Sequence, residues 1–112
     1  MHGNPLADIR YAFLDTVNPG GTIIVPPQGS NVKIRVLSAL VVMSGAVGVR
    51  FTGTASGNLS AQFPVLANGG FVLPLNTYGW LETAPNEGLN VNLSSGTAGG
   101  VQVCWYPIKA AL

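Results

Sequence analysis

Apolar residues recur at every second position along much of the chain, with polar residues or glycine between them. This period of two is typical of β-strands that bury one face, because successive side chains of a strand point to opposite sides. Leu89, Val91 and Leu93, separated by Asn90 and Asn92, are the clearest case. The pattern therefore predicts a chain that is built mainly of strands.

Turn-forming residues interrupt these segments along the whole chain, which has 15 Gly and 8 Pro. Clusters such as Pro26-Pro27-Gln28-Gly29 fall between the apolar runs, where chain reversals need them. The remaining segments predict eight or nine strands, near residues 9–13, 22–25, 32–43, 47–52, 58–66, 71–75, 80–83, 89–93 and 101–106. We expect the last strand to end at Pro107, because proline has no N–H for the ladder.

Short strands without helices for parallel crossovers are typical of antiparallel architectures. We therefore predict an all-β fold, a two-sheet antiparallel β-sandwich that is jelly-roll-like. The 112 residues and 11.5 kDa have room for one domain, which we place at residues 9–112. Residues 1–8 lack periodicity and contain Pro5, so they predict an N-terminal arm, either extended towards a neighbouring molecule or disordered.

The segment 32–43 departs from simple alternation in its second half, where both faces are apolar. In its first half Lys33 and Arg35 share one face. Strict alternation puts Leu37, Ala39, Val41 and Met43 on one face of the second half and Val36, Leu40 and Val42 on the other. Both faces therefore need cover, which either a loop or terminus of the same chain or another subunit can provide.

The chain is poor in charge, with 5 Lys or Arg residues and 4 Asp or Glu residues. Charged residues make up 8% of it, compared with about 25% in an ordinary soluble domain. The net charge of +1 and the lack of a basic run argue against a nucleic-acid partner. The most apolar run, residues 36–49, is interrupted by Ser and Gly and is shorter than the roughly 20 residues of a membrane helix, and residues 1–12 do not resemble a secretory signal.

Two interpretations of this low charge stay open. Ser, Thr and Asn side chains can solvate a neutral surface well enough for a monomer. Alternatively, so few charges with a net charge near zero favour association, and the surface is covered by neighbouring molecules.

Residues that carry enzymatic chemistry are scarce and scattered. His2, the one histidine, lies at a terminus, and Cys104 has no second thiol or histidine to lower its pKa or to share a metal. We therefore expect Cys104 to pack inertly in its strand. The four carboxylates include no adjacent pair, and the glycine-rich segment 96–100 lacks the Lys-Ser or Lys-Thr of a phosphate-binding loop. The sequence accordingly predicts no catalytic residue, cofactor or metal.

Aromatic side chains are the remaining resource for recognition. Tyr78, Trp80, Trp105 and Tyr106 provide either a sugar-stacking platform or a hot spot for protein binding, unless they lie in the core. We expect Trp105 and Phe51 to be core residues, and Tyr78 and Tyr106 to be partly exposed.

The order of strands and turns between residues 22 and 106 resembles small β-sandwich virion proteins of tailed bacteriophages. The segments that carry the resemblance are VVMSGAVGVRFTG (41–53), LANGG (66–70), GWLET (79–83), GLNVNL (88–93) and GVQVCWY (100–106). The resemblance implies an auxiliary structural protein, a decoration or cement subunit that binds and stabilises the assembled capsid, often as a homotrimer at local three-fold positions. It further implies the major capsid protein as partner, synthesis in the bacterial host cytoplasm and a final location on the capsid surface of the virion.

The same resemblance extends to small domains of phage tail or fibre proteins, so a carbohydrate- or receptor-binding module is the alternative function. It transfers no catalytic residues. For protein contacts we expect the N-terminal segment and the exposed aromatic side chains to matter most. The candidate interface residues are Pro5, Leu6, Ile9, Tyr78, Trp80 and Tyr106.

Overall fold

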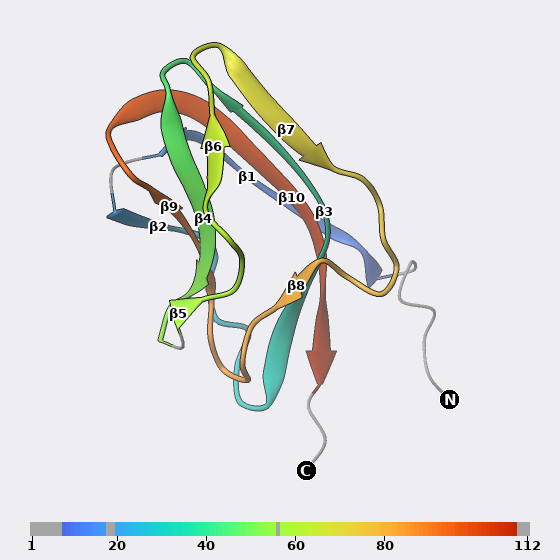
Figure 1. The fold of residues 1–112 in the computed structure, drawn as a ribbon. Helices are drawn as coiled ribbons and strands as arrows, with labels where there is room; N and C mark the ends of the chain where they lie inside the picture. Colours follow the sequence, from blue (N-terminus) through green and yellow to red (C-terminus); the bar gives the residue numbers. More distant parts are fainter. Residues whose placement is uncertain (1–7, 18–19, 56, 110–112) are drawn as a thin grey trace.

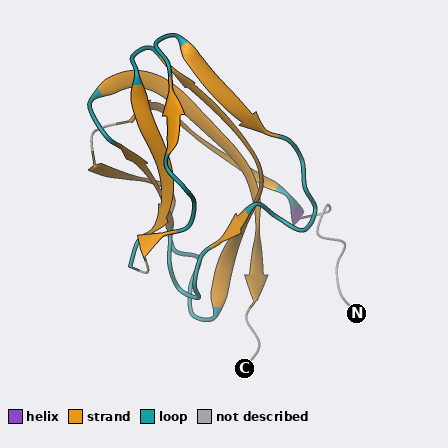
Figure 2. Ribbon diagram, viewed as in Figure 1, coloured by secondary structure: helices purple, strands orange, loops and turns teal. Residues whose placement is uncertain are grey.

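Two antiparallel sheets of five strands each pack face to face in the computed structural model, which describes residues 8–17, 20–55 and 57–109 (Figures 1 and 2). This arrangement confirms the predicted two-sheet β-sandwich. Sheet A has the order β1 (Arg10–Val17), β10 (Thr97–Lys109), β3 (Val32–Met43) and β7 (Gly69–Leu73), with β8 (Leu81–Glu82) also beside β3. Sheet B has the order β2 (Gly20–Val25), β9 (Leu89–Leu93), β4 (Val47–Gly53) and β5 (Gly57–Asn58), with β6 (Phe63–Val65) also beside β4.

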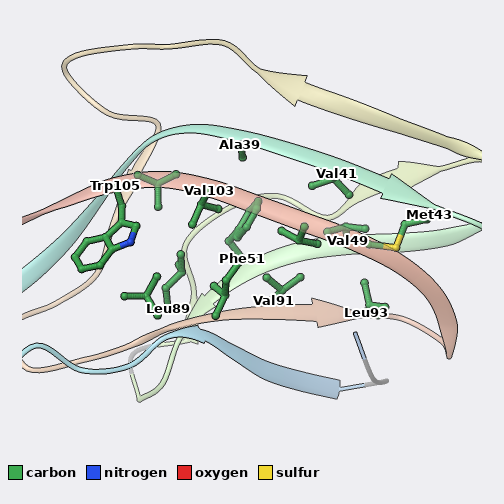
Figure 3. Close-up of a cluster of buried hydrophobic side chains, with 14 of the residues drawn as sticks. Ala39, Val41, Met43, Val49, Phe51, Leu89, Val91, Leu93, Val103 and Trp105 are labelled. Atoms are coloured by element: carbon green, nitrogen blue, oxygen red, sulfur yellow. The ribbon is translucent and has the colours of Figure 1, made fainter. Parts of the chain in front are cut away.

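The core lies between the two sheets and is filled mainly by β-branched and leucine side chains (Figure 3). Such side chains suit strands because their restricted rotamers pack well on a pleated surface. Phe51 of β4 and Trp105 of β10 are buried in this core, as the sequence predicts. The alternation of β9 is confirmed as well, since Leu89, Val91 and Leu93 all point into the core.

A β-bulge in β3 changes which side chains share a face. Leu37 has no partner on β10, because its neighbours Val36 and Ser38 pair with successive residues of that strand. Val36 therefore joins Ala39 in the core between the sheets, and Leu37 joins Leu40 on the outer face of sheet A. The prediction that grouped Leu37 with Ala39, and Val36 with Leu40, is wrong because it assumed a regular strand.

Two strand boundaries also differ from the prediction. β10 continues past Pro107 to Lys109, alongside β3 alone, because the pairing with β1 ends where Arg10 meets Trp105. A strand tolerates proline where one of its sides is a free edge. The predicted strand 58–66 is divided into β5 and β6, because the Ser60 hydroxyl accepts the hydrogen bond of the Phe51 N–H in place of a ladder carbonyl.

Candidate functional site

One row of side chains crosses the outer face of sheet A from edge to edge. Phe13 of β1 lies opposite Gln102 of β10, Gln102 lies opposite Leu40 of β3, and Leu40 lies opposite Val72 of β7. Phe13, Leu40 and Val72 are exposed to solvent in the isolated chain. Tyr11 extends the same apolar surface along β1. We call these five residues, together with Val42, the outer patch.

Two shallow grooves flank Leu40 within the outer patch. The larger has a volume of about 300 Å³ and lies between Tyr11 and the segment that follows β7. The smaller, of about 180 Å³, lies between Phe13 and Val42. Asp15 is the one charged residue that lines either groove. The outer patch is therefore both apolar and nearly free of charge.

The outer face of sheet B provides a contrast. Asn90 and Asn92 point outwards from β9, Arg50 of β4 lies opposite Asn92, and Ile23 of β2 lies opposite Asn90. Ile23 is the exposed large hydrophobic residue of this face within the described strands. Antiparallel sheets commonly leave one face wet, and a polar face such as this one is suited to water. The two outer faces of the sandwich thus differ in kind.

The other end of the outer face of sheet A is covered by the chain itself. Leu37, Cys104 and Tyr106 form a small buried cluster there, against which Ile9 and Ile108 pack. The segment between β7 and β8 runs beside this part of β3 (Figure 1), and its Asn76 N–H donates a hydrogen bond to the Leu37 carbonyl. Its own chain therefore covers the apolar half of β3 at Leu37, as the first alternative expects, whereas Leu40 is exposed.

Tyr106 does not have the predicted partial exposure. Only 8% of it is exposed, because it belongs to the cluster around Leu37. Its hydroxyl accepts a hydrogen bond from Arg35 Nη1 at 3.1 Å. A contact with another molecule would have to displace its own chain first, so Tyr106 is no longer a candidate interface residue. Cys104 is buried beside it, in agreement with inert packing.

Lys33 and Arg35 share the outer face, as predicted, and both bind Glu82 of β8. Oε1 of Glu82 accepts hydrogen bonds from Arg35 Nε at 2.9 Å and Nη2 at 2.6 Å, and Oε2 accepts one from Lys33 Nζ at 3.2 Å. Burial alone would raise the pKa of Glu82, but the bonds from Arg35 and Lys33 hold this pKa below its ordinary value. Burial alone would likewise lower the pKa of Arg35, whereas Glu82 and Tyr106 raise it.

Tyr78 and Trp80 are exposed beside this charged group, as expected of Tyr78. The Trp80 N–H donates to the Val36 carbonyl at 2.8 Å, and its indole Nε1–H donates to the Pro74 carbonyl at 2.7 Å. The Tyr78 N–H donates to Asn76 Oδ1 at 3.0 Å. Both aromatic side chains therefore project from a segment whose backbone is firmly held.

The other predicted site residues have different outcomes. Pro5 and Leu6 lie outside the described residues, as does His2. Ile9 is partly buried against the Tyr106 cluster. Sequence reasoning did not select Tyr11 or the row across sheet A, although a regular strand places Tyr11 and Phe13 on the same face as the charged Asp15, which was a signal for exposed aromatic side chains on β1.

The described residues contain no group of three or more His, Cys, Asp or Glu side chains that could hold a metal ion. No helix among them is long and apolar enough to cross a membrane.

A scan against protein-family models finds no match, and a search of curated proteins finds none either. Among solved structures, the chain is similar to the capsular polysaccharide assembling protein CapF from Staphylococcus aureus, with 16% identity, a TM-score of 0.28, and coverage of 91% of this chain and 28% of that one. A structure of CapF with the inhibitor 3-isopropenyl-tropolone gives 15% identity and a TM-score of 0.29, over 91% of this chain and 31% of that one. The chain thus spans less than a third of CapF, and this weak likeness does not bear on function.

Proposed function

We propose that this chain is a virion structural protein of the head-decoration kind, which binds an assembled capsid through the outer patch of sheet A. The observation that carries the proposal is the exposed apolar row of Phe13, Leu40 and Val72. Burying apolar surface contributes about 25 cal/mol per Å², and an exposed apolar patch of this kind marks an interaction site.

The size of the outer patch favours repeated contacts over one strong contact. The patch spans four strands about 4.8 Å apart and, from the level of Tyr11 to that of Val42, five positions with a rise of about 3.3 Å, which gives a flat area of roughly 300 Å². A stable protein–protein interface covers about 800 Å² on each partner. A single contact through the patch is therefore weak, and it becomes effective when several linked copies bind together.

A homotrimer on a capsid lattice meets this requirement. Once one subunit has bound, its two companions bind at a high effective concentration. Because such a ligand binds the assembled lattice better than separate capsid subunits, it stabilises the assembled state. The partners in this proposal are further copies of the chain and the major capsid protein, the location is the capsid surface, and the chain needs no catalytic residue, cofactor or metal.

The low charge of the chain supports the same function. Contact between neutral surfaces avoids the cost of desolvating ionised side chains. Asp15 is the one charged group at the edge of the outer patch, and the polar outer face of sheet B remains for water. The distribution of charge thus favours a subunit whose sheet A contacts other proteins and whose sheet B faces solvent.

Co-sedimentation with empty capsid shells of the phage that encodes the chain tests the proposal. The variant Leu40→Lys places a charge in the centre of the patch, whereas Ile23→Lys is a matched control on sheet B, since the two residues are 47% and 52% exposed. We expect the wild type and Ile23→Lys to bind, and Leu40→Lys to bind at least about tenfold more weakly. Failure of the wild type to bind, or equal binding by both variants, would contradict the proposal.

A further inference from the structure

A third of the charged residues of this charge-poor chain meet at one place. Lys33, Arg35 and Glu82 are three of its 5 basic and 4 acidic residues, and they form one hydrogen-bonded group. The group adjoins a polar hollow of about 200 Å³ that is separate from the two apolar grooves. Its lining consists of Arg35, Tyr78, Gly79, Trp80, Leu81 and Glu82, which we call the cradle.

The cradle has donors to spare. A guanidinium group has five N–H bonds, and three of those of Arg35 are used, two by Glu82 and one by Tyr106. Lys33 lies outside the lining of the cradle and uses one of its three N–H bonds on Glu82. With two cations and one carboxylate, the group has a formal charge of +1. It is therefore suited to an acceptor that carries a negative charge.

The aromatic side chains add an apolar surface to these donors. Tyr78 is 88% exposed, and Trp80 is 45% exposed with its indole fixed by the bond to Pro74. Gly79, between them, has a φ of 86°, and a methyl group there would lie 2.5 Å from Cγ of Arg35. Glycine thus lets the backbone lie directly on the Arg35 side chain, which brings both aromatic residues to the charged group.

We infer that the cradle binds a monosaccharide unit that carries a carboxylate, such as a hexuronate. An aromatic ring stacks against the C–H face of a sugar, and the free N–H groups of Arg35 bind the carboxylate and neighbouring hydroxyls, while the charge of Lys33, outside the lining, adds to the attraction. A hollow of about 200 Å³ is smaller than the roughly 300–1,000 Å³ of a drug-sized site, which suits one ring. This site gives the glycan alternative considered from the sequence a definite place and ligand. It is independent of the proposed assembly role.

Titration with three small ligands, followed by two-dimensional NMR of the ¹⁵N-labelled chain, tests the inference. Methyl glucuronide has both ring and carboxylate, methyl glucoside has the ring alone, and acetate has the carboxylate alone. We expect glucuronide to shift the Trp80 indole N–H and the Arg35 Nε–H signals in a saturable way. Both other ligands should bind at least about tenfold more weakly, because each lacks one part of the contact.

Two variants locate the site. Tyr78→Ala removes an exposed ring and should weaken glucuronide binding by about two- to tenfold without unfolding the chain. Tyr11→Ala is the matched control, since Tyr11 is also exposed, at 70%, but belongs to the outer patch. It should leave sugar binding unchanged and weaken shell binding instead. The inference is overturned if glucuronide shifts neither signal, if acetate or glucoside binds as well as glucuronide, or if Tyr78→Ala has no effect.

Discussion

Leu37 and Leu40 lie on the same outer face of sheet A, because Leu37 occupies the bulge of β3. In a regular strand two residues that are three positions apart would point to opposite faces. The two residues have opposite environments. Leu37 is buried in the cluster with Cys104 and Tyr106, whereas Leu40 is exposed in the middle of the outer patch. The outer face of β3 is therefore covered by the chain itself at Leu37 and exposed at Leu40. The outer patch ends between these two residues.

The different environments of these two leucines predict different costs of truncation. Leu37→Ala leaves a cavity in a closed cluster and should lower the free energy of unfolding by about 2–5 kcal/mol. Leu40→Ala should lower it by less than about 1 kcal/mol, because its side chain already contacts water. Urea denaturation of dilute protein measures both values. Similar losses for the two variants would contradict the placement of Leu37.

Gly70 and Gly100 both lie opposite Val42, one on each side of β3, and offer a second matched pair. A methyl group at position 70 would overlap the carbonyl oxygen of Val41, whereas at position 100 its nearest neighbour is the Leu14 carbonyl oxygen at 3.7 Å. Gly70→Ala should therefore destabilise the chain by about 1–3 kcal/mol or more, since β7 must move away from β3. Gly100→Ala should leave the stability nearly unchanged. Thermal unfolding of both variants measures the difference. A reversed order would show that β7 does not approach β3 in this way.

The bonds to Glu82 predict a pH dependence of stability. Because they hold the pKa of Glu82 below its ordinary value, they stabilise the fold above the unfolded pKa of about 4.3. This contribution is lost as the pH falls through the lower, folded pKa. Since Glu82 is partly exposed, we expect an effect under about 1 kcal/mol.

The variant Glu82→Gln isolates that effect, because every other carboxylate of the chain titrates in both proteins. Urea midpoints at neutral pH and below the folded pKa should show a smaller acid-induced loss in the variant than in the wild type. Equal losses would mean that Glu82 is not held by Arg35 and Lys33 in solution.

The buried thiol of Cys104 gives a direct probe of the closed cluster. Its reaction with a disulfide reagent should be at least about 100-fold slower in the native chain than in the unfolded chain, because it requires local opening. Gln102→Cys in a Cys104→Ser background is the control, since position 102 is exposed on the same strand and face. Rapid reaction of native Cys104 would show that the cluster is open.

Much of the architecture follows from the alternation of side chains. The burial of Phe51 and Trp105 is confirmed, and so is the prediction that Lys33 and Arg35 lie on the same face. A period of two determines which side chains share a face as long as a strand is regular. The bulge at Leu37 breaks that condition, and it depends on the pairing with β10, a strand distant in sequence.

Tyr106 shows a second limit of sequence reasoning. The residues beside Tyr106 in the sequence do not indicate that Leu37 will turn outwards, or that Ile9 will pack against the same cluster. The row of Phe13, Leu40 and Val72 could not be predicted from the sequence either, because its residues come from three strands whose order the alternation does not specify. Contacts between distant strands therefore decide the candidate site.

The central proposal places this chain in a phage particle, and a cryo-electron microscopy reconstruction of that particle is its most direct test. The proposal predicts that protein density from the capsid or from a neighbouring copy covers Phe13, Leu40 and Val72, and that Asn90 and Asn92 face solvent. A particle in which the outer patch is bare and sheet B lies against the shell would contradict it.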